Sequence, residues 1–109
     1  MSDDDLRSWI KAVDISRPLS QHEVRRLTKW ILQNGGEVGW TTHAREELKK
    51  DNMTTVDAAN VIRCWRYMDQ AEQDQRTGEW LYRIHTDFMG VVVKFRSVTQ
   101  LTGITAWRK

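Results

Sequence analysis

Several patterns that mark large classes of proteins are scarce or missing in this chain. Its single cysteine, Cys64, cannot form a disulfide within the chain, and Pro18 is its only proline. No apolar run approaches the roughly 18 residues that a membrane-spanning helix requires. Internal repeats, low-complexity segments and phosphate-binding glycine loops are also missing from the sequence. These absences exclude disulfide scaffolds, bundles of membrane helices, repeat arrays and P-loop nucleotide binding.

Export and metal-binding signals are equally scarce. The N-terminus is acidic and polar, unlike a signal peptide. With a lone cysteine, it predicts a cytoplasmic protein with no membrane partner. His22, His43 and His85 lie far apart in sequence and lack metal-ligand spacing, so we expect no metal and no cofactor. Cys64 is expected to be a small buried thiol near the end of a helix.

The length and amino-acid composition of the chain are typical of a single domain. Of 109 residues, 39% are hydrophobic and 29% are charged, which is typical of a globular chain. Six tryptophans provide large rings with which a small domain can build its core. We therefore expect a single domain over residues 1–109, with residues 1–5 as a mobile acidic tail.

The net charge of +2 is unevenly distributed along the chain. Residues 37–75 carry five basic and eight acidic side chains, whereas residues 76–109 carry six basic and two acidic ones. A segregated basic segment is compatible with a solvated strand face, but it also favours a polyanionic partner such as RNA.

The first 65 residues predict helices. Apolar residues spaced at i, i+3, i+4 and i+7 predict a short first helix that ends before Pro18. Capping patterns at Ser20, at Thr41 or Thr42, and at Thr54 predict the starts of three more. The last should reach about residue 65, and its expected buried residues are Val56, Ala59, Ile62 and Trp65. A short extended piece over residues 37–40 precedes the third helix.

After residue 65 the apolar period changes from 3.6 to 2, which predicts strands. Residues 66–73 form a possible edge strand, and alternating strands follow over about 80–85, 91–96 and 104–107. We expect an α+β fold in which N-terminal helices pack on a three- to four-stranded antiparallel sheet.

Alternation divides the side chains of the strands between two faces. The expected core face collects Trp80, Tyr82, Ile84, Val91, Val93 and Phe95. The opposite face collects Arg83, His85, Lys94 and Arg96. Neighbouring like charges repel by up to about 1 kcal/mol for a cross-strand pair, so an anionic ligand would stabilise such a face.

The chemistry that suits this face is RNA cleavage by attack of the 2′-hydroxyl on the adjacent phosphate. His85 can serve as acid or base near neutral pH. The planar guanidinium groups of Arg83, Arg96 and Arg108 suit the phosphate, and Lys94 adds a point charge. Trp107 lies on the same face by parity and offers a surface on which a base can stack.

The order of several short motifs resembles the MqsR toxins, which have the RelE-like ribonuclease fold. The resemblance covers residues 19–109, and its motifs are Leu19-Ser20-Gln21, Thr41-Thr42, Asn60-Val61-Ile62, Tyr82-Arg83 and Thr105-Ala106-Trp107-Arg108-Lys109. It implies cleavage of messenger RNA, with or without the ribosome, and neutralisation by an antitoxin protein. It also implies that Tyr82 joins the catalytic set, that Arg66 is the basic residue after the last helix, and that Arg108 is the one in the closing strand.

The RNA-binding set expected around this catalytic group is Arg66, Arg76, Trp107 and His43. The segment that begins Thr42-His43-Ala44 also resembles a related domain family of unknown function with the same order of elements. Two family positions differ: a strand tyrosine is absent from Val91-Val92-Val93-Lys94, and a glutamine is replaced by Glu79 or Trp80.

Two alternatives remain open from the sequence. The missing family residues favour a non-catalytic module of the same fold that binds RNA or a protein. The cations of the second helix, at Arg25, Arg26 and Lys29, allow a DNA-binding helix instead.

Overall fold

The computed structural model describes residues 3–109, with side chains from Asp5 onward. The helices are α1 (Asp3–Ala12), α2 (Gln21–Gln33), α3 (Thr42–Lys50) and α4 (Thr55–Cys64). The strands are β1 (Glu37–Trp40), β2 (Tyr67–Met68), β3 (Glu72–Gln73), β4 (Trp80–His85), β5 (Met89–Ser97) and β6 (Gln100–Arg108). None of the helices in residues 3–109 has the length and hydrophobicity of a membrane-spanning segment.

The strands form one mixed sheet in the order β1-β6-β5-β4-β2, and β3 pairs with the start of β4. The α+β class is confirmed, but the sheet has six strands rather than three or four. It is also not purely antiparallel, because β1 runs parallel to β6. The additional strands β1, β2 and β3 have four residues or fewer, and an alternating pattern that short does not predict which strand each one pairs with. At Gly103, which pairs with Trp40, a side chain would collide with the Trp40 ring, so glycine leaves room for the indole.

The predicted helix starts are confirmed by their hydrogen bonds. The Ser20 hydroxyl accepts from the Glu23 amide at 3.2 Å, and the Glu23 carboxylate accepts from the Ser20 amide at 3.1 Å. Thr54 and Asp57 form the same reciprocal pair at the start of α4, whereas Thr41 caps α3 through its hydroxyl alone, which accepts from the Ala44 amide. At the other end of α2, Gly35 adopts a φ of 68°, which favours glycine and lets the chain leave the helix.

Two expectations about helices need correction. Val56 is 75% exposed, and the buried residues of α4 are Ala58, Val61 and Ile62, followed by Trp65. This set has the i, i+3, i+4, i+7 spacing of a helix face, whereas Val56 and Ala59 lie off that face. The expected tail over residues 1–5 also overlaps α1, which begins at Asp3; residues 1 and 2 lie outside the described part.

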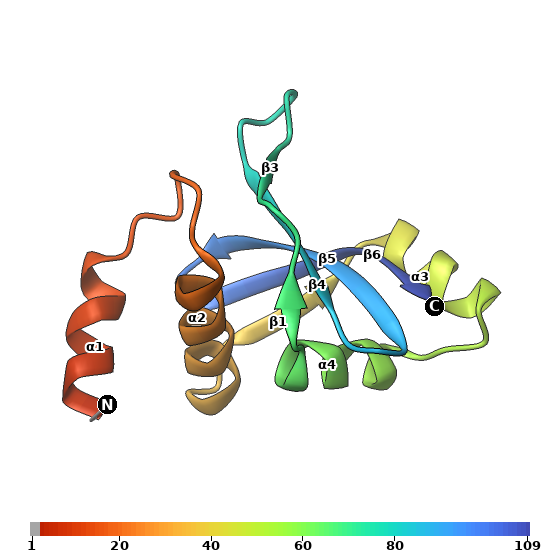
Figure 1. Ribbon diagram of the computed structural model, residues 1–109, viewed down its shortest axis with the longest axis horizontal. Helices are drawn as coiled ribbons and strands as arrows, with labels where there is room; N and C mark the ends of the chain where they lie inside the picture. The colour runs from red at the N-terminus through yellow and green to blue at the C-terminus, as the bar shows by residue number, and fades with distance from the viewer. Residues whose placement is uncertain (1–2) are drawn as a thin grey trace.

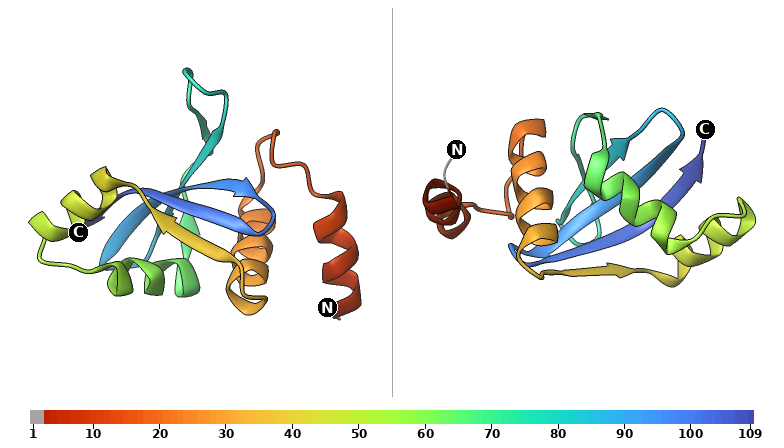
Figure 2. Two further views of the ribbon diagram at one scale, coloured as in Figure 1. Left: turned by 180° about the vertical axis from the view of Figure 1, so that it is seen from behind. Right: turned by 90° about the horizontal axis from the view of Figure 1, so that it is seen from below.

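Helices α2 and α4 lie against one face of the sheet, as seen from below in Figure 2. α1 lies beside α2 at the end of the molecule opposite the C-terminus (Figure 1), where the Arg26 guanidinium sits 4.4 Å from the centre of the Trp9 ring. α3 packs along β6. The core between helices and sheet therefore joins elements that are distant in sequence, with Leu27, Ile62 and Val91 at its centre.

Tyr82 connects this core to the chain that enters α2. Its side chain is buried, and its hydroxyl accepts a hydrogen bond from the Leu19 amide at 3.0 Å. Burial raises the pKa of the Tyr82 hydroxyl above its usual value. The neutral phenol is thus a structural acceptor within the core.

We predict that Tyr82→Phe lowers the free energy of unfolding by about 1–2 kcal/mol, because the buried Leu19 amide loses its acceptor. Urea denaturation measures this change. Tyr67→Phe is the matched control, since it removes the same atom from a half-exposed ring and should cost less than about 0.5 kcal/mol. Equal effects of the two substitutions would contradict the structural role of the Tyr82 hydroxyl.

Candidate nucleic-acid interface

The sheet face opposite α2 and α4, here called the outer face, carries one row of side chains across four strands. Tyr67 of β2 pairs with His85 of β4, His85 pairs with Gly90 of β5, and Gly90 pairs with Trp107 of β6. A side chain at Gly90 would collide with the Trp107 ring. Glycine therefore allows the indole to lie over β5 and reach His85 on the next strand.

His85 is the centre of this row, and it is buried rather than exposed as expected. Only 6% of the residue is accessible, because the Tyr67 ring stacks on it at 4.6 Å and the edge of Trp107 meets it at 5.6 Å. Its Nε2 atom lies 2.9 Å from the Asp69 carboxylate, and its buried Nδ1 has no hydrogen-bond partner among the described residues. The prediction of a directly accessible His85 acid or base was wrong, since the pairing of β2 with β4 covers it.

Arg83 lies in the next row of the outer face and is exposed. Its guanidinium carbon lies 5.3 Å from the centre of the Trp107 ring, a cation–π geometry. The prediction that Arg83 and Trp107 share one face is confirmed. Together they offer a cation and an aromatic surface at the same place.

Lys94 and Arg96 also occupy the outer face, but only Arg96 is exposed. The Lys94 side chain is 13% accessible, and its ammonium donates to the Glu79 carboxylate at 2.9 Å. That hydrogen bond, aided by the nearby positive charges of Lys94 and Arg96, lowers the pKa of the Glu79 carboxyl below its usual value. The expectation of a freely available Lys94 is therefore corrected, because Glu79 already neutralises it.

Tyr82 stands on the core face, as its alternation predicted, so it is not part of the outer face. The catalytic role implied for it by the MqsR resemblance does not fit this position, since its hydroxyl is buried and already bonded to Leu19.

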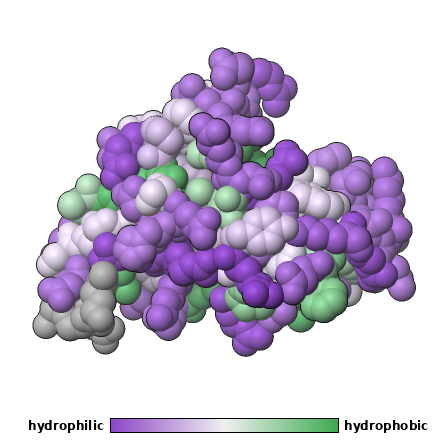
Figure 3. Space-filling model, viewed as in Figure 1, coloured by the Kyte–Doolittle hydropathy of each residue, from purple (hydrophilic) through white to green (hydrophobic). Residues whose placement is uncertain are grey.

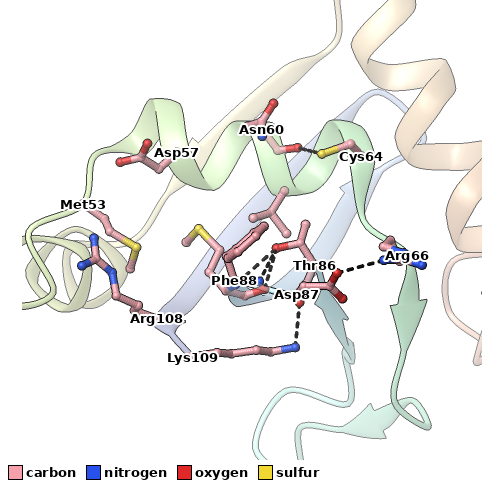
Figure 4. Close-up of a pocket in the computed structure, with 12 residues that line it drawn as sticks. Met53, Asp57, Asn60, Cys64, Arg66, Thr86, Asp87, Phe88, Arg108 and Lys109 are labelled. Carbon is pink, nitrogen blue, oxygen red and sulfur yellow. Dashed lines mark hydrogen bonds and ion pairs between the residues drawn. The ribbon is translucent and has the colours of Figure 1, made fainter.

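Arg66 and Arg108, which the resemblance also singled out, line a groove at one end of the sheet. This hairpin-end groove has a volume of about 600 Å³ and lies between α4, the β4–β5 turn and the end of β6 (Figure 4). Arg66 pairs with Asp87 of the turn at 2.9 Å. No ion pair is formed by the Arg108 side chain within the described residues.

Lys109 joins the groove to the outer face, and the sequence reasoning did not identify it. Its ammonium donates hydrogen bonds to the Tyr67 hydroxyl and to the Thr86 carbonyl, and it lies 4.7 Å from the Tyr67 ring centre. Tyr67 was missed too, although the alternation after residue 65 placed an edge strand there. A basic residue at the end of a closing strand is too common a signal to have identified Lys109.

The remaining candidates are not brought to this region. Arg76 lies in the turn between β3 and β4, which projects away from the sheet (Figure 1). His43 is exposed in the first turn of α3 and does not line the hairpin-end groove. Cys64 is exposed and lines the hairpin-end groove, so the expectation of a buried thiol was wrong. In residues 3–109, no group of three or more acidic, His or Cys side chains is arranged to hold a metal ion.

The DNA-binding interpretation of the second helix fits poorly with the contacts of its cations. Arg25 donates hydrogen bonds to the carbonyls of Trp65 and Arg66, at 2.8 Å and 3.1 Å. Arg26 lies over the Trp9 ring. Two of the three cations thus contribute to packing between elements rather than to a basic surface.

The outer face and the groove together resemble a surface for a single-stranded polyanion more than a closed pocket. Exposed guanidinium groups at Arg83, Arg96 and Arg108 can contact phosphates, while Trp107 and Tyr67 present rings for bases. Polar and charged residues dominate the side of the molecule seen in Figure 3, with hydrophobic residues in small separate patches.

We predict that Glu79→Gln lowers the free energy of unfolding by about 1 kcal/mol at pH 7, because Lys94 loses its charged partner. The folded-state pKa of Glu79 is lowered, so the stabilisation is present above the unfolded pKa and disappears as pH falls through the folded one. The difference from wild type should shrink steadily in denaturation curves as the pH is lowered through that range. Glu46→Gln, at an exposed carboxylate, is the control; a difference that is as large in acid as at neutral pH would contradict the ion pair.

Known proteins provide no match to this chain: no protein-family model, curated protein or solved structure is significantly similar to it. The resemblance to the MqsR toxins therefore stays a prediction from the short motifs quoted above.

Proposed function

We propose that this domain is a toxin-type endoribonuclease that binds single-stranded RNA on the outer face and cleaves it without a metal ion. The observation that carries the proposal is the Arg83 cation over the Trp107 ring, in line with His85, Tyr67 and Lys109. Along this strip, rings that can stack lie beside exposed cations that can contact phosphate, while His85 is buried beneath them.

The strip suits RNA because its two kinds of group match the two parts of a nucleotide chain. Bases stack on aromatic rings with about 1–3 kcal/mol per base, regardless of their identity. Guanidinium groups bind phosphate oxygens through two parallel hydrogen bonds. A strand crossing the sheet would place bases on Trp107 and Tyr67 and phosphates near Arg83 and Arg96.

For cleavage, the accessible proton-transfer groups are Asp69 and Tyr67 rather than His85. The Asp69 side chain is 52% accessible and can take the proton of the attacking 2′-hydroxyl. The Tyr67 hydroxyl, which accepts from Lys109, can pass its own proton to the leaving 5′-oxygen. His85 would be a positioning residue that donates from Nε2 to Asp69. The products are a 2′,3′-cyclic phosphate and a free 5′-hydroxyl.

The MqsR resemblance extends this proposal to its biological setting. It favours messenger RNA as substrate, either free or on the ribosome, in the cytoplasm. It also favours an antitoxin protein that neutralises the activity.

A second candidate is a non-catalytic RNA-binding module with the same fold. The observation in its favour is the burial of His85, since neither of its ring nitrogens is then open to a substrate on the outer face. Binding through the same cations and rings would be unaffected, whereas cleavage would not occur.

We predict that Arg83→Ala with Arg96→Ala weakens binding of a single-stranded RNA oligomer about tenfold or more at 0.1 M salt. Because the double variant removes two cations that bind phosphate, the slope of log K against log salt should flatten by about 1.4. Fluorescence anisotropy over a salt series measures both. Arg7→Ala with Lys11→Ala removes the same charge from α1 and should leave both quantities unchanged. Equal losses in the two double variants would contradict binding on the outer face.

We predict that Tyr67→Phe and Asp69→Asn each reduce RNA cleavage about 10²–10⁴-fold, because each removes a proton-transfer group, while RNA binding stays within about twofold. Cleavage of labelled RNA by purified protein, together with growth arrest on induction, measures the effect. Wild-type protein that binds RNA but neither cleaves it nor arrests growth would favour the non-catalytic module. Cleavage by both variants at the wild-type rate would reject these residues as proton donors or acceptors.

A further inference from the structure

The hairpin-end groove differs from the outer face because it combines an apolar lining with a cationic rim. Met53, Val61 and Met89 contribute its apolar surface, and Asn60 contributes a carboxamide on the α4 side. Phe88, from the β4–β5 turn, is 79% exposed although it is a large apolar ring. An aromatic side chain left in water beside an open groove provides a surface on which a flat ring can stack.

The cations of the groove are better placed for a ligand than its carboxylates. Asp87 is already paired with Arg66, and an Asp57 oxygen accepts from the Thr54 amide at the start of α4. The Arg108 side chain has no ion pair in residues 3–109, and its backbone amide is held by Asp51 at 3.1 Å. The groove therefore has a fixed strand end that carries an available guanidinium.

We infer that this groove binds one nucleotide of the RNA, with its base against Phe88 and its phosphate at Arg108. A base needs a flat apolar surface, which the Phe88 ring supplies. Asn60 lies on the α4 side of the groove (Figure 4), where its Oδ1 accepts from Arg63. The volume of about 600 Å³ falls in the range of small-ligand pockets. This inference rests on the proposed RNA-binding function and adds a nucleotide subsite outside the outer face.

Lys109 makes the path between the two regions continuous. It lines the groove and also donates to the hydroxyl of Tyr67, whose ring belongs to the row of the outer face. A strand that crosses that row can thus continue around the end of the sheet, with its next phosphate near Lys109 and the following base in the groove. The groove would then select among bases next to the point of cleavage.

The only cysteine of the chain reports directly on occupancy of the groove. Cys64 is exposed and lines it, and its thiol donates to the Asn60 carbonyl. Alkylation by neutral iodoacetamide, followed by intact mass, can be compared with and without each of the four nucleoside 5′-monophosphates. The same alkylation is measured with the matched nucleosides, with inorganic phosphate and with an RNA oligomer.

We predict that at least one nucleoside monophosphate, and the RNA oligomer, slow alkylation of Cys64 more than the nucleoside or phosphate does. Arg108→Ala should raise the half-protecting nucleotide concentration about tenfold, and Phe88→Ala should raise it as well. Arg7→Ala, on α1 at the far end of the molecule, should leave it unchanged. Each variant is compared with its own rate without ligand, and circular dichroism confirms its fold.

Two results would overturn the inference. RNA that binds, with the loss expected for the Arg83/Arg96 double variant, but leaves Cys64 fully reactive would reject the groove while the proposed function stands. Equal protection by inorganic phosphate and by nucleotides would reject the base-binding part. By contrast, failure of the proposed function appears separately, as wild-type protein that shows no RNA binding in the anisotropy measurement.

Discussion

The contact of Arg25 with the junction between α4 and β2 is the interaction on which the arrangement of the candidate site depends. A helix end leaves backbone carbonyls without partners, and Arg25 of α2 donates to two carbonyls just past the end of α4, on Trp65 and Arg66. The same guanidinium stacks 3.9 Å from the centre of the Trp65 ring, and that indole donates to the Thr28 hydroxyl. One side chain thereby joins α2 to the point where the helical half of the chain becomes the sheet.

The position of this junction determines where the functional groups of β2 and β4 lie. The Arg66 amide donates to the His85 carbonyl, which starts the pairing of β2 with β4. Pairing brings the Tyr67 ring onto His85 and the Asp69 carboxylate to its Nε2 atom. A two-residue strand thus converts an exposed histidine into a buried one. The accessible proton-transfer groups are then Tyr67 of that strand and Asp69 just after it, instead of His85.

On the outer face and in the groove, some cations are paired with carboxylates, which favours stability, and others are left available to bind an anion. Glu79 and Asp87 each neutralise one cation, which reduces the repulsion that neighbouring positive charges would cause. Arg83 is stabilised by an aromatic ring instead of a carboxylate, so its hydrogen-bond donors stay available to phosphate. An anionic strand can therefore bind without first displacing an internal partner from that arginine.

The sequence by itself determined the local features of this protein, because these depend on neighbouring residues. Capping at Ser20 and Thr54, the helix-ending glycine, and the two-face alternation of residues 80–85 and 91–96 all follow from short-range geometry. Only the tertiary structure decided the parallel pairing of β1 with β6, the burial of His85 and the meeting of Arg66, Arg108 and Lys109. Those features depend on which distant backbone a short strand pairs with. Periodicity within one segment carries no information on that choice.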